Sequence, residues 1–281
     1  MREPPRRRKT TSRNGSPVLR RGKDFGLKMD IGPGETADPL CGGRLRILQK
    51  AQGYRFSVDS LLLAWFTRVR DRGRVLDLGS GSGILSAVLA FRFPTVEVTG
   101  IEIQEELARM ARRTAALNGL EERVRILQGD ASEIRNLVPP ESFDVAVFNP
   151  PYRKLRSGRM NENAERAVAR HELHGSLGTF LKAARYALRG GGEAFLVYPA
   201  VRGVELFWRM RRETLEPKTV RFVHSRRDSA GEFVLVRAVR GGGEELKVLP
   251  PLFLYGDGEG YSAEAMEIFR EISEPPGPSG T

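Results

Sequence analysis

Polar side chains follow four consecutive predicted strands of this 281-residue chain, close to the point where each strand ends. Asp77 lies at the end of the first strand, just before a turn that has three glycines in five residues. Glu102 closes the second strand, Asp130 follows the third, and Asn149 follows the fourth. The carboxyl ends of parallel strands meet at one edge of a sheet, where such proteins bind their ligands. We therefore expect one crevice lined by these four side chains.

The glycine turn is suited to a ligand that comes close to the main chain. Gly79, Gly81 and Gly83 allow a sharp turn, and the helix that follows presents N-terminal amides that favour polar or anionic groups. A dinucleotide-binding fingerprint needs glycine where Ile84 stands, so a pyrophosphate is not the expected ligand. A carboxylate in the position of Glu102 can accept hydrogen bonds from both hydroxyls of a ribose.

The turn Asn149-Pro150-Pro151-Tyr152 is suited to an amine whose lone pair is delocalised into a ring. The two prolines fix φ and provide no N–H, so the stiff turn can direct the Asn149 side chain and the Pro150 carbonyl outward. Both oxygens can accept hydrogen bonds from one NH₂ group, which localises the nitrogen lone pair. Tyr152 offers a flat face on which an extruded base can stack. The turn therefore predicts a site that activates a planar amine.

An alternation of strands and helices positions these residues. Short apolar runs predict buried strands, at residues 74–78, 97–101, 124–127, 144–148 and 193–198. Apolar residues at spacings of three and four predict helices, at residues 59–69, 84–91, 107–117, 177–188 and 204–215. Two further strands are expected at 219–224 and 232–240, and a short hairpin around Leu45, Ile47, Tyr54 and Phe56. This order predicts an α/β fold with a doubly wound, mostly parallel sheet of seven strands that ends in an antiparallel hairpin.

The charge of the chain is concentrated at its beginning. Lys and Arg total 46 and Asp and Glu 35, a net charge of +11, and residues 1–28 alone contribute +8. This segment predicts a disordered arm that contacts nucleic acid phosphates. It is also compatible with a solvated tail, or with a translation start at Met29. We expect an arm and linker at 1–43, one domain at 44–265 and a tail at 266–281.

The composition excludes several other classes of protein. No apolar run approaches the roughly 18 residues of a membrane span, so we expect no membrane partner. The single cysteine, Cys41, excludes a disulfide scaffold and a cysteine zinc site, and we expect no metal and a cytoplasmic location. The sequence leaves the oligomeric state open and is compatible with a monomer.

The stretch at residues 75–83 and the pair Ile101-Glu102 resemble the first two motifs of the class I methyltransferases that use S-adenosylmethionine. The resemblance implies a Rossmann-like fold, with the glycine turn against the methionine part of the cofactor and Glu102 on its ribose. It places Asp130 and Ala131 beside the adenine. The residues that it assigns to the cofactor are Phe56, Asp59, Asp77, Gly79, Gly81, Gly83, Glu102, Ile103, Asp130, Ala131 and Asn149.

The turn at 149–152 is similar to that of amino-methyltransferases, which act on adenine, cytosine or glutamine amides. The stretches at residues 53–63, 157–161, 169–172 and 246–251 resemble bacterial tRNA methyltransferases that modify the adenine amine (N6) next to the anticodon of a valine tRNA. The likeness runs from about residue 44 to residue 261. It implies that residues 149–152 are catalytic and that tRNA is the partner. Four cations after the turn would contact RNA, namely Arg153, Lys154, Arg156 and Arg159, with a solvated loop as the alternative.

Other functions remain open at this point. The turn at 149–152 also permits methylation of ribosomal RNA or DNA. A protein glutamine N5-methyltransferase would carry a helical domain ahead of the catalytic one, whereas the first 43 residues here are basic and rich in Gly and Pro. An RNA-binding module on an inactive methyltransferase fold is disfavoured because Asp77, Glu102, Asp130 and the whole turn are present.

Overall fold

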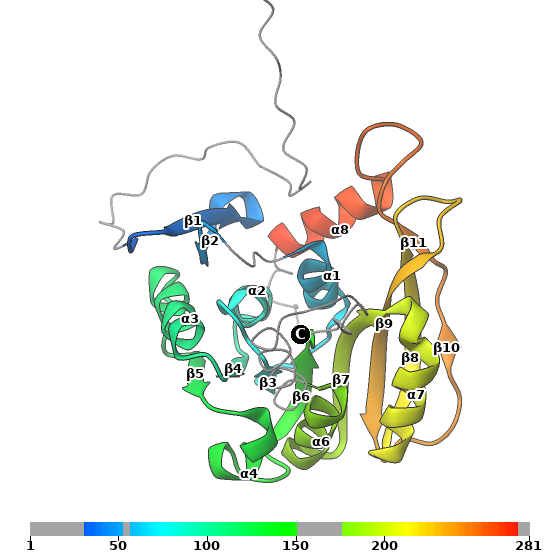
Figure 1. Cartoon of the computed structure of the whole chain (residues 1–281), viewed down its shortest axis with the longest axis horizontal. Helices are drawn as coiled ribbons and strands as arrows, with labels where there is room; N and C mark the ends of the chain where they lie inside the picture. The colour runs from blue at the N-terminus through cyan, green and yellow to red at the C-terminus, as the bar shows by residue number, and fades with distance from the viewer. Residues whose placement is uncertain (1–30, 53–56, 151–175, 275–281) are drawn as a thin grey trace, which may run out of the picture.

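A nine-stranded sheet runs through the part of the chain that the computed structural model describes, which is residues 31–52, 57–150 and 176–274 (Figure 1). The strands are β3 (Arg74–Leu78), β4 (Glu97–Glu102), β5 (Val124–Gln128), β6 (Phe143–Phe148), β7 (Leu188–Pro199), β8 (Leu215–His224), β9 (Gly231–Arg240), β10 (Lys247–Val248) and β11 (Leu252–Phe253). Their order is β10-β8-β9-β7-β6-β3-β4-β5, with β11 also paired to β8. Strand β9 is antiparallel to β7 and β8, and the other pairs in this sheet are parallel. The predicted α/β fold is confirmed, and the two-residue strands β10 and β11 extend it at one edge.

Helices cover both faces of the sheet (Figure 1). One face packs against α1 (Val58–Phe66), α2 (Ile84–Arg92), α3 (Glu105–Leu117) and α8 (Ala263–Ser273), and the other against α4 (Ile134–Leu137), α6 (Leu177–Ala187) and α7 (Gly203–Arg212). Successive strand residues point to opposite faces, so Val75 joins the first core and Leu76 the second. Because both faces are buried, the strands are continuous apolar runs without alternation, which is typical of parallel sheets.

A separate two-stranded hairpin precedes the sheet. Strand β1 (Glu35–Leu40) pairs antiparallel with β2 (Leu45–Lys50), and β2 lies against α3. Strand β1 thus lies within the segment expected to be a linker. Leu45 and Ile47 belong to a hairpin, and the partner strand that the structure describes for them is β1. The glycines and prolines before residue 44 are typical of a linker, yet proline is tolerated on an edge strand such as β1, which contains Pro39. Tyr54 and Phe56 lie outside the described residues.

The C-terminal boundary also differs from the prediction. Helix α8 runs through residue 266, where the tail was expected to begin, and ends at Ser273. Ser262 caps this helix by accepting a hydrogen bond from the Ala265 N–H at 3.1 Å. Ala265, Ile268 and Ile272 bury one face of it, at the helical spacings that hold it to the domain. Within the described part of the chain, no helix combines the length and the apolar character needed to cross a membrane.

Candidate active site

The register of the sheet brings the predicted site residues to one edge. Leu78 of β3 is paired with Ile101 of β4 and with Phe148 of β6, so the residues that follow them lie side by side. Neighbouring strands are about 4.8 Å apart. Asn149 and Pro150, which together we call the Asn149 corner, therefore follow the strand next to the one that leads into the glycine turn, and Glu102 lies on the other side of that turn.

The glycine turn has the backbone conformation that its sequence predicts. Gly79, Gly81 and Gly83 have φ values of +73°, +57° and +84°, in the left-handed region that favours glycine. A side chain at Gly83 would meet Ala111 of α3 at 3.0 Å, so this glycine allows α2 to pack closely on α3. A side chain at Gly81 would meet no described atom within 4 Å. The main chain at Gly81 is thus open to a ligand.

Glu102 ties the glycine turn to the end of β4. Its Oε2 accepts a hydrogen bond from the Gly81 N–H at 2.9 Å, and its Oε1 accepts one from the Gln104 N–H at 2.9 Å. Burial raises the pKa of this carboxyl, although these backbone N–H groups and that of Ile103 favour the charged form. Each carboxylate oxygen can accept a second hydrogen bond. Glu102 can therefore hold the loop and a pair of hydroxyl donors together.

Asp77 lies beneath the turn and is only 1% exposed. Its Oδ2 accepts a hydrogen bond from the Ser86 hydroxyl at 2.6 Å, which connects β3 to the first turns of α2. Burial raises the pKa of the Asp77 carboxyl to about 7, opposed by the bonds from Ser86 and assisted by the charge of Glu102. A direct contact of Asp77 with a cofactor stays a prediction, whereas its support of the turn is visible in these contacts.

Asp130 begins a short turn after β5. Its side chain accepts a hydrogen bond from the Ser132 N–H at 2.8 Å and caps the single turn η2 (Ala131–Glu133). Ala131 is buried at the start of that turn. Both residues lie two strands away from the glycine turn of β3, beyond Glu102. Ile103, by contrast, is 42% exposed after the end of β4.

Asn149 is held by two polar side chains of α1. Its Nδ2 donates hydrogen bonds to Asp59 Oδ2 and to Ser60 Oγ, both at 3.2 Å. Because an ionised carboxylate only accepts, the amide nitrogen must face Asp59, and the orientation of the amide is determined by chemistry. The other amide atom, Oδ1, is buried and has no hydrogen-bond partner among the residues that the structure describes. An unpaired buried acceptor is costly in a folded protein, and this one lies next to the glycine turn.

The contact between Asp59 and Asn149 was not expected from the sequence, which assigned Asp59 to the cofactor. Asp59 is 1% exposed, and its Oδ1 also accepts a hydrogen bond from the Ser60 N–H at 2.8 Å. The available signal was the position of an acidic residue in the first turn of a predicted apolar helix. Its partner is 90 residues away along the chain, so local pattern could not have revealed it.

Several predicted site residues lie outside the described part of the chain, namely Phe56, Pro151, Tyr152, Arg153, Lys154, Arg156 and Arg159. Their roles stay predictions. Pro150 is described and is buried directly after Asn149. Among the described residues, no group of three or more His, Cys, Asp or Glu side chains could hold a metal ion.

The strand order, with one antiparallel strand between β7 and β8, and the glycine turn after β3 define a Rossmann-like methyltransferase fold. The fold matches the crystal structure of a predicted O-methyltransferase from Agrobacterium tumefaciens with a TM-score of 0.63, at 21% identity, over 76% of this chain and 96% of that one. The family model of the methyltransferase small domain matches residues 57–214. The chain belongs to this family.

Two relatives indicate the branch of the family to which the chain is similar. A protein of Aeromonas hydrophila named tRNA1(Val) (adenine(37)-N6)-methyltransferase is 31% identical over 188 residues, 66% of this chain and 77% of the relative. A protein of Porphyromonas gingivalis with the same name is 34% identical over 135 residues, 46% of this chain. In that second match the chain spans about half of the relative's length, 52%.

Proposed function

We propose that the protein is an S-adenosylmethionine-dependent methyltransferase that methylates the exocyclic N6 amine of an adenine in tRNA, next to the anticodon of a valine tRNA. One observation carries this proposal. Asn149 has a buried Oδ1 without a partner among the described residues, at the end of the strand next to the one that leads into the glycine turn, and Asp59 holds the orientation of its amide. The names of the two relatives support the choice of adenine and tRNA over other amines.

The residues present fit the cofactor at three points. The open backbone at Gly81 leaves room for the amino acid part, and Glu102 has acceptor capacity for the ribose hydroxyls. Asp130 and the buried Ala131 would border the adenine at the end of β5. The cofactor supplies a methyl group on a positively charged sulfur, a leaving group that needs no covalent enzyme intermediate.

The chain's own contribution is to activate and place the amine. The lone pair of an exocyclic adenine amine is delocalised into the ring, so the amine is a weak nucleophile. Asn149 Oδ1 and the carbonyl oxygen of Pro150 would accept the two N–H hydrogens, which favours a tetrahedral nitrogen with a localised lone pair. Holding that nitrogen in line with the methyl carbon can lower the barrier by several kcal/mol. After methyl transfer, the extra proton of the product ammonium leaves to water.

Recognition of RNA in this proposal includes the cations of the segment after the turn. Arg153, Lys154, Arg156 and Arg159 would contact the phosphate backbone around the extruded base. We also retain as a proposal the division of the chain into a basic arm, a catalytic domain and a tail, with the bounds moved to include β1 and α8.

The test is methyl transfer to unmodified tRNA. Purified protein is incubated with methyl-labelled S-adenosylmethionine and bulk tRNA that lacks the modification, and the nucleosides are then identified by mass spectrometry. The proposal expects labelled N6-methyladenosine, mapped beside the anticodon of a valine tRNA. Label in a protein glutamine, in ribosomal RNA or in DNA, with none in tRNA, would replace the proposal by the corresponding alternative.

A further inference from the structure

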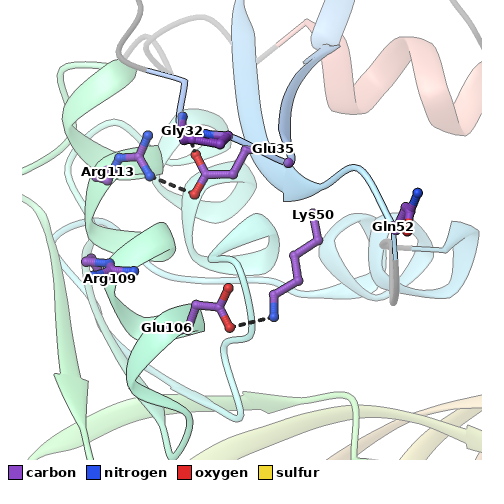
Figure 2. Close-up of a pocket in the computed structure, with 9 residues that line it drawn as sticks. Gly32, Glu35, Lys50, Gln52, Glu106, Arg109 and Arg113 are labelled. Atoms are coloured by element: carbon purple, nitrogen blue, oxygen red, sulfur yellow. Dashed lines mark hydrogen bonds and ion pairs between the residues drawn. The ribbon is translucent and has the colours of Figure 1, made fainter.

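A polar cavity of about 710 Å³ lies outside the candidate active site, between the β1–β2 hairpin and helix α3 (Figure 2). The hairpin contributes Glu35 and Lys50 to its wall, and α3 contributes Glu106, Arg109 and Arg113. The three α3 residues share one face of the helix, because they are three and four positions apart. The wall is therefore built from two segments that are far apart in the sequence.

Two ion pairs connect the walls of this cavity, and a third cation of the wall takes part in neither. Arg113 Nη1 lies 2.8 Å from Glu35 Oε1, and Lys50 Nζ lies 2.5 Å from Glu106 Oε2 (Figure 2). Arg109 stands between these pairs on α3 and has no ion-pair or hydrogen-bond partner among the described residues. With three cations against two carboxylates, the cavity has a net charge of +1 and an exposed guanidinium.

The hairpin wall is anchored to α3. The Arg46 N–H donates to Asn118 Oδ1 at 2.8 Å, and Asn118 Nδ2 donates back to the Arg46 carbonyl at 2.8 Å. The Leu48 N–H donates to Thr114 Oγ1 at 3.3 Å. A wall held in this way loses little conformational freedom when a ligand binds, which favours affinity.

The cavity is close to the candidate active site along the chain. Glu106 is four residues after Glu102, so even an extended chain would keep the two within about 14 Å. Gly32 belongs to the cavity wall, and the 1–28 segment, with its charge of +8, ends four residues before it in the sequence. A planar guanidinium can bind two oxygens of a phosphate at once, so the positive charge of this cavity is suited to a phosphate of a nucleic acid backbone.

We infer that this cavity binds a backbone phosphate of the RNA substrate, with Arg109 as the principal contact and Lys50 and Arg113 beside it. The inference rests on the proposed function, since it names a second contact for the same tRNA. Binding here anchors the RNA at a distance from the nucleotide in the Asn149 corner. It adds affinity and register without reading the base sequence.

The test compares three single substitutions in the full chain, each of which changes the charge by one. Arg109→Gln removes the unpaired cation, and Glu106→Gln removes an acid from the same cavity. Arg125→Gln is the matched control, because Arg125 is exposed on β5 and lies outside the cavity. Binding of unmodified tRNA is measured by fluorescence anisotropy at several salt concentrations. Methyl transfer by the wild type to the same tRNA is measured in parallel.

The expected effects have opposite signs at the two cavity residues. Arg109→Gln weakens tRNA binding about 3- to 10-fold and reduces the slope of log K against log salt by about 0.7–0.9, whereas Glu106→Gln tightens binding about 2-fold. Arg125→Gln stays within about 2-fold of the wild type. Equal losses of tRNA affinity in Arg109→Gln and Arg125→Gln, or weaker tRNA binding by Glu106→Gln, would overturn the inference. The proposed function would still stand if the wild type transfers methyl to the same tRNA.

The source of the phosphate is tested separately with inorganic phosphate. Calorimetric titration of the wild type with inorganic phosphate is expected to show only weak binding, with a Kd above about 1 mM. Binding tighter than about 0.1 mM that Arg109→Gln abolishes would identify a site for a free anion and contradict the assignment to RNA. If the wild type transfers no methyl to tRNA, it is the proposed function that fails.

Discussion

Asp59→Asn is expected to impair catalysis by turning the Asn149 amide around. In the structure, Asp59 Oδ1 accepts from the Ser60 N–H, and Asp59 Oδ2 accepts from Asn149 Nδ2. An asparagine at 59 keeps the first bond with its oxygen and so places its NH₂ where Oδ2 was. Two NH₂ groups then face each other, and Asn149 relieves this by rotating its Oδ1 toward residue 59. The acceptor for the substrate amine is thereby replaced by a donor.

The size of the effect follows from the bonds that change. A hydrogen bond to a charged acceptor contributes about 1.5–3 kcal/mol, and a buried donor left unpaired costs about 1–3 kcal/mol. We take the rotated amide to be favoured by about 1.4–2.8 kcal/mol, which leaves the productive orientation in roughly 1–10% of molecules. The expected loss of kcat/KM is therefore about 10- to 100-fold. Ser60→Ala removes the weaker neutral partner and is expected to cost no more than about 3-fold.

The assay is a double-mutant cycle on methyl transfer to unmodified tRNA, with calorimetric binding of S-adenosylmethionine alongside. If Asp59 acts through Asn149, Asp59→Asn should add nothing to Asn149→Ala, and cofactor affinity should stay within about 3-fold of the wild type. Additive losses in the cycle, or a large loss of cofactor affinity with kcat unchanged, would refute this reasoning. Asp59 would then be a direct contact of the cofactor, as the family resemblance alone implies.

Three further predictions follow from the contacts around the glycine turn. Gly83→Ala should lower the free energy of unfolding by about 2 kcal/mol or more, because the added methyl group meets Ala111 and the residue has a φ of +84°. Gly81→Ala should lower it by only about 1 kcal/mol, measured by denaturant unfolding, yet weaken cofactor binding. Glu102→Gln should weaken the cofactor Kd, measured by calorimetry, about 10-fold or more, because an amide cannot replace both acceptor oxygens; an unchanged Kd would remove Glu102 from the site. The pKa of Asp77 is about 7 in the folded state and near 4 in the unfolded state, so the folded state keeps this proton to a higher pH. The free energy of unfolding should therefore fall as the pH rises from about 4 to about 7, by up to roughly 4 kcal/mol. Asp77→Asn should flatten that decline in denaturant midpoints, and an identical decline in the variant would contradict the assignment.

The sequence predicts the site residues that local pattern encodes. Glycines in a turn after a buried strand, and an acid at the end of the next strand, are visible because parallel strands place their ends at one edge. In the structure, Leu78 is paired with Ile101 and with Phe148, so the ends of β3, β4 and β6 lie side by side as expected. The α/β class and seven of the nine strands are predicted because buried strands and amphipathic helices alternate along the chain.

The features that the sequence did not reveal depend on contacts between distant segments. The hydrogen bond between Asp59 and Asn149 spans 90 residues, and the ion pair between Glu35 and Arg113 spans 78. Helix α8 is not predicted from the sequence, because its apolar positions are followed directly by a Pro/Gly-rich end that is typical of a tail. Packing against neighbouring elements decided the structure there, and composition did not.

The central claim is that the Asn149 corner activates the amine and does not merely build the cofactor site. It is tested most directly by measuring the single-turnover rate of methyl transfer and the Kd of S-adenosylmethionine in the same preparation of Asn149→Ala. We predict a transfer rate reduced at least about 100-fold, with a Kd within about 3-fold of the wild type. Equal losses in rate and cofactor affinity, or a transfer rate close to that of the wild type, would contradict it.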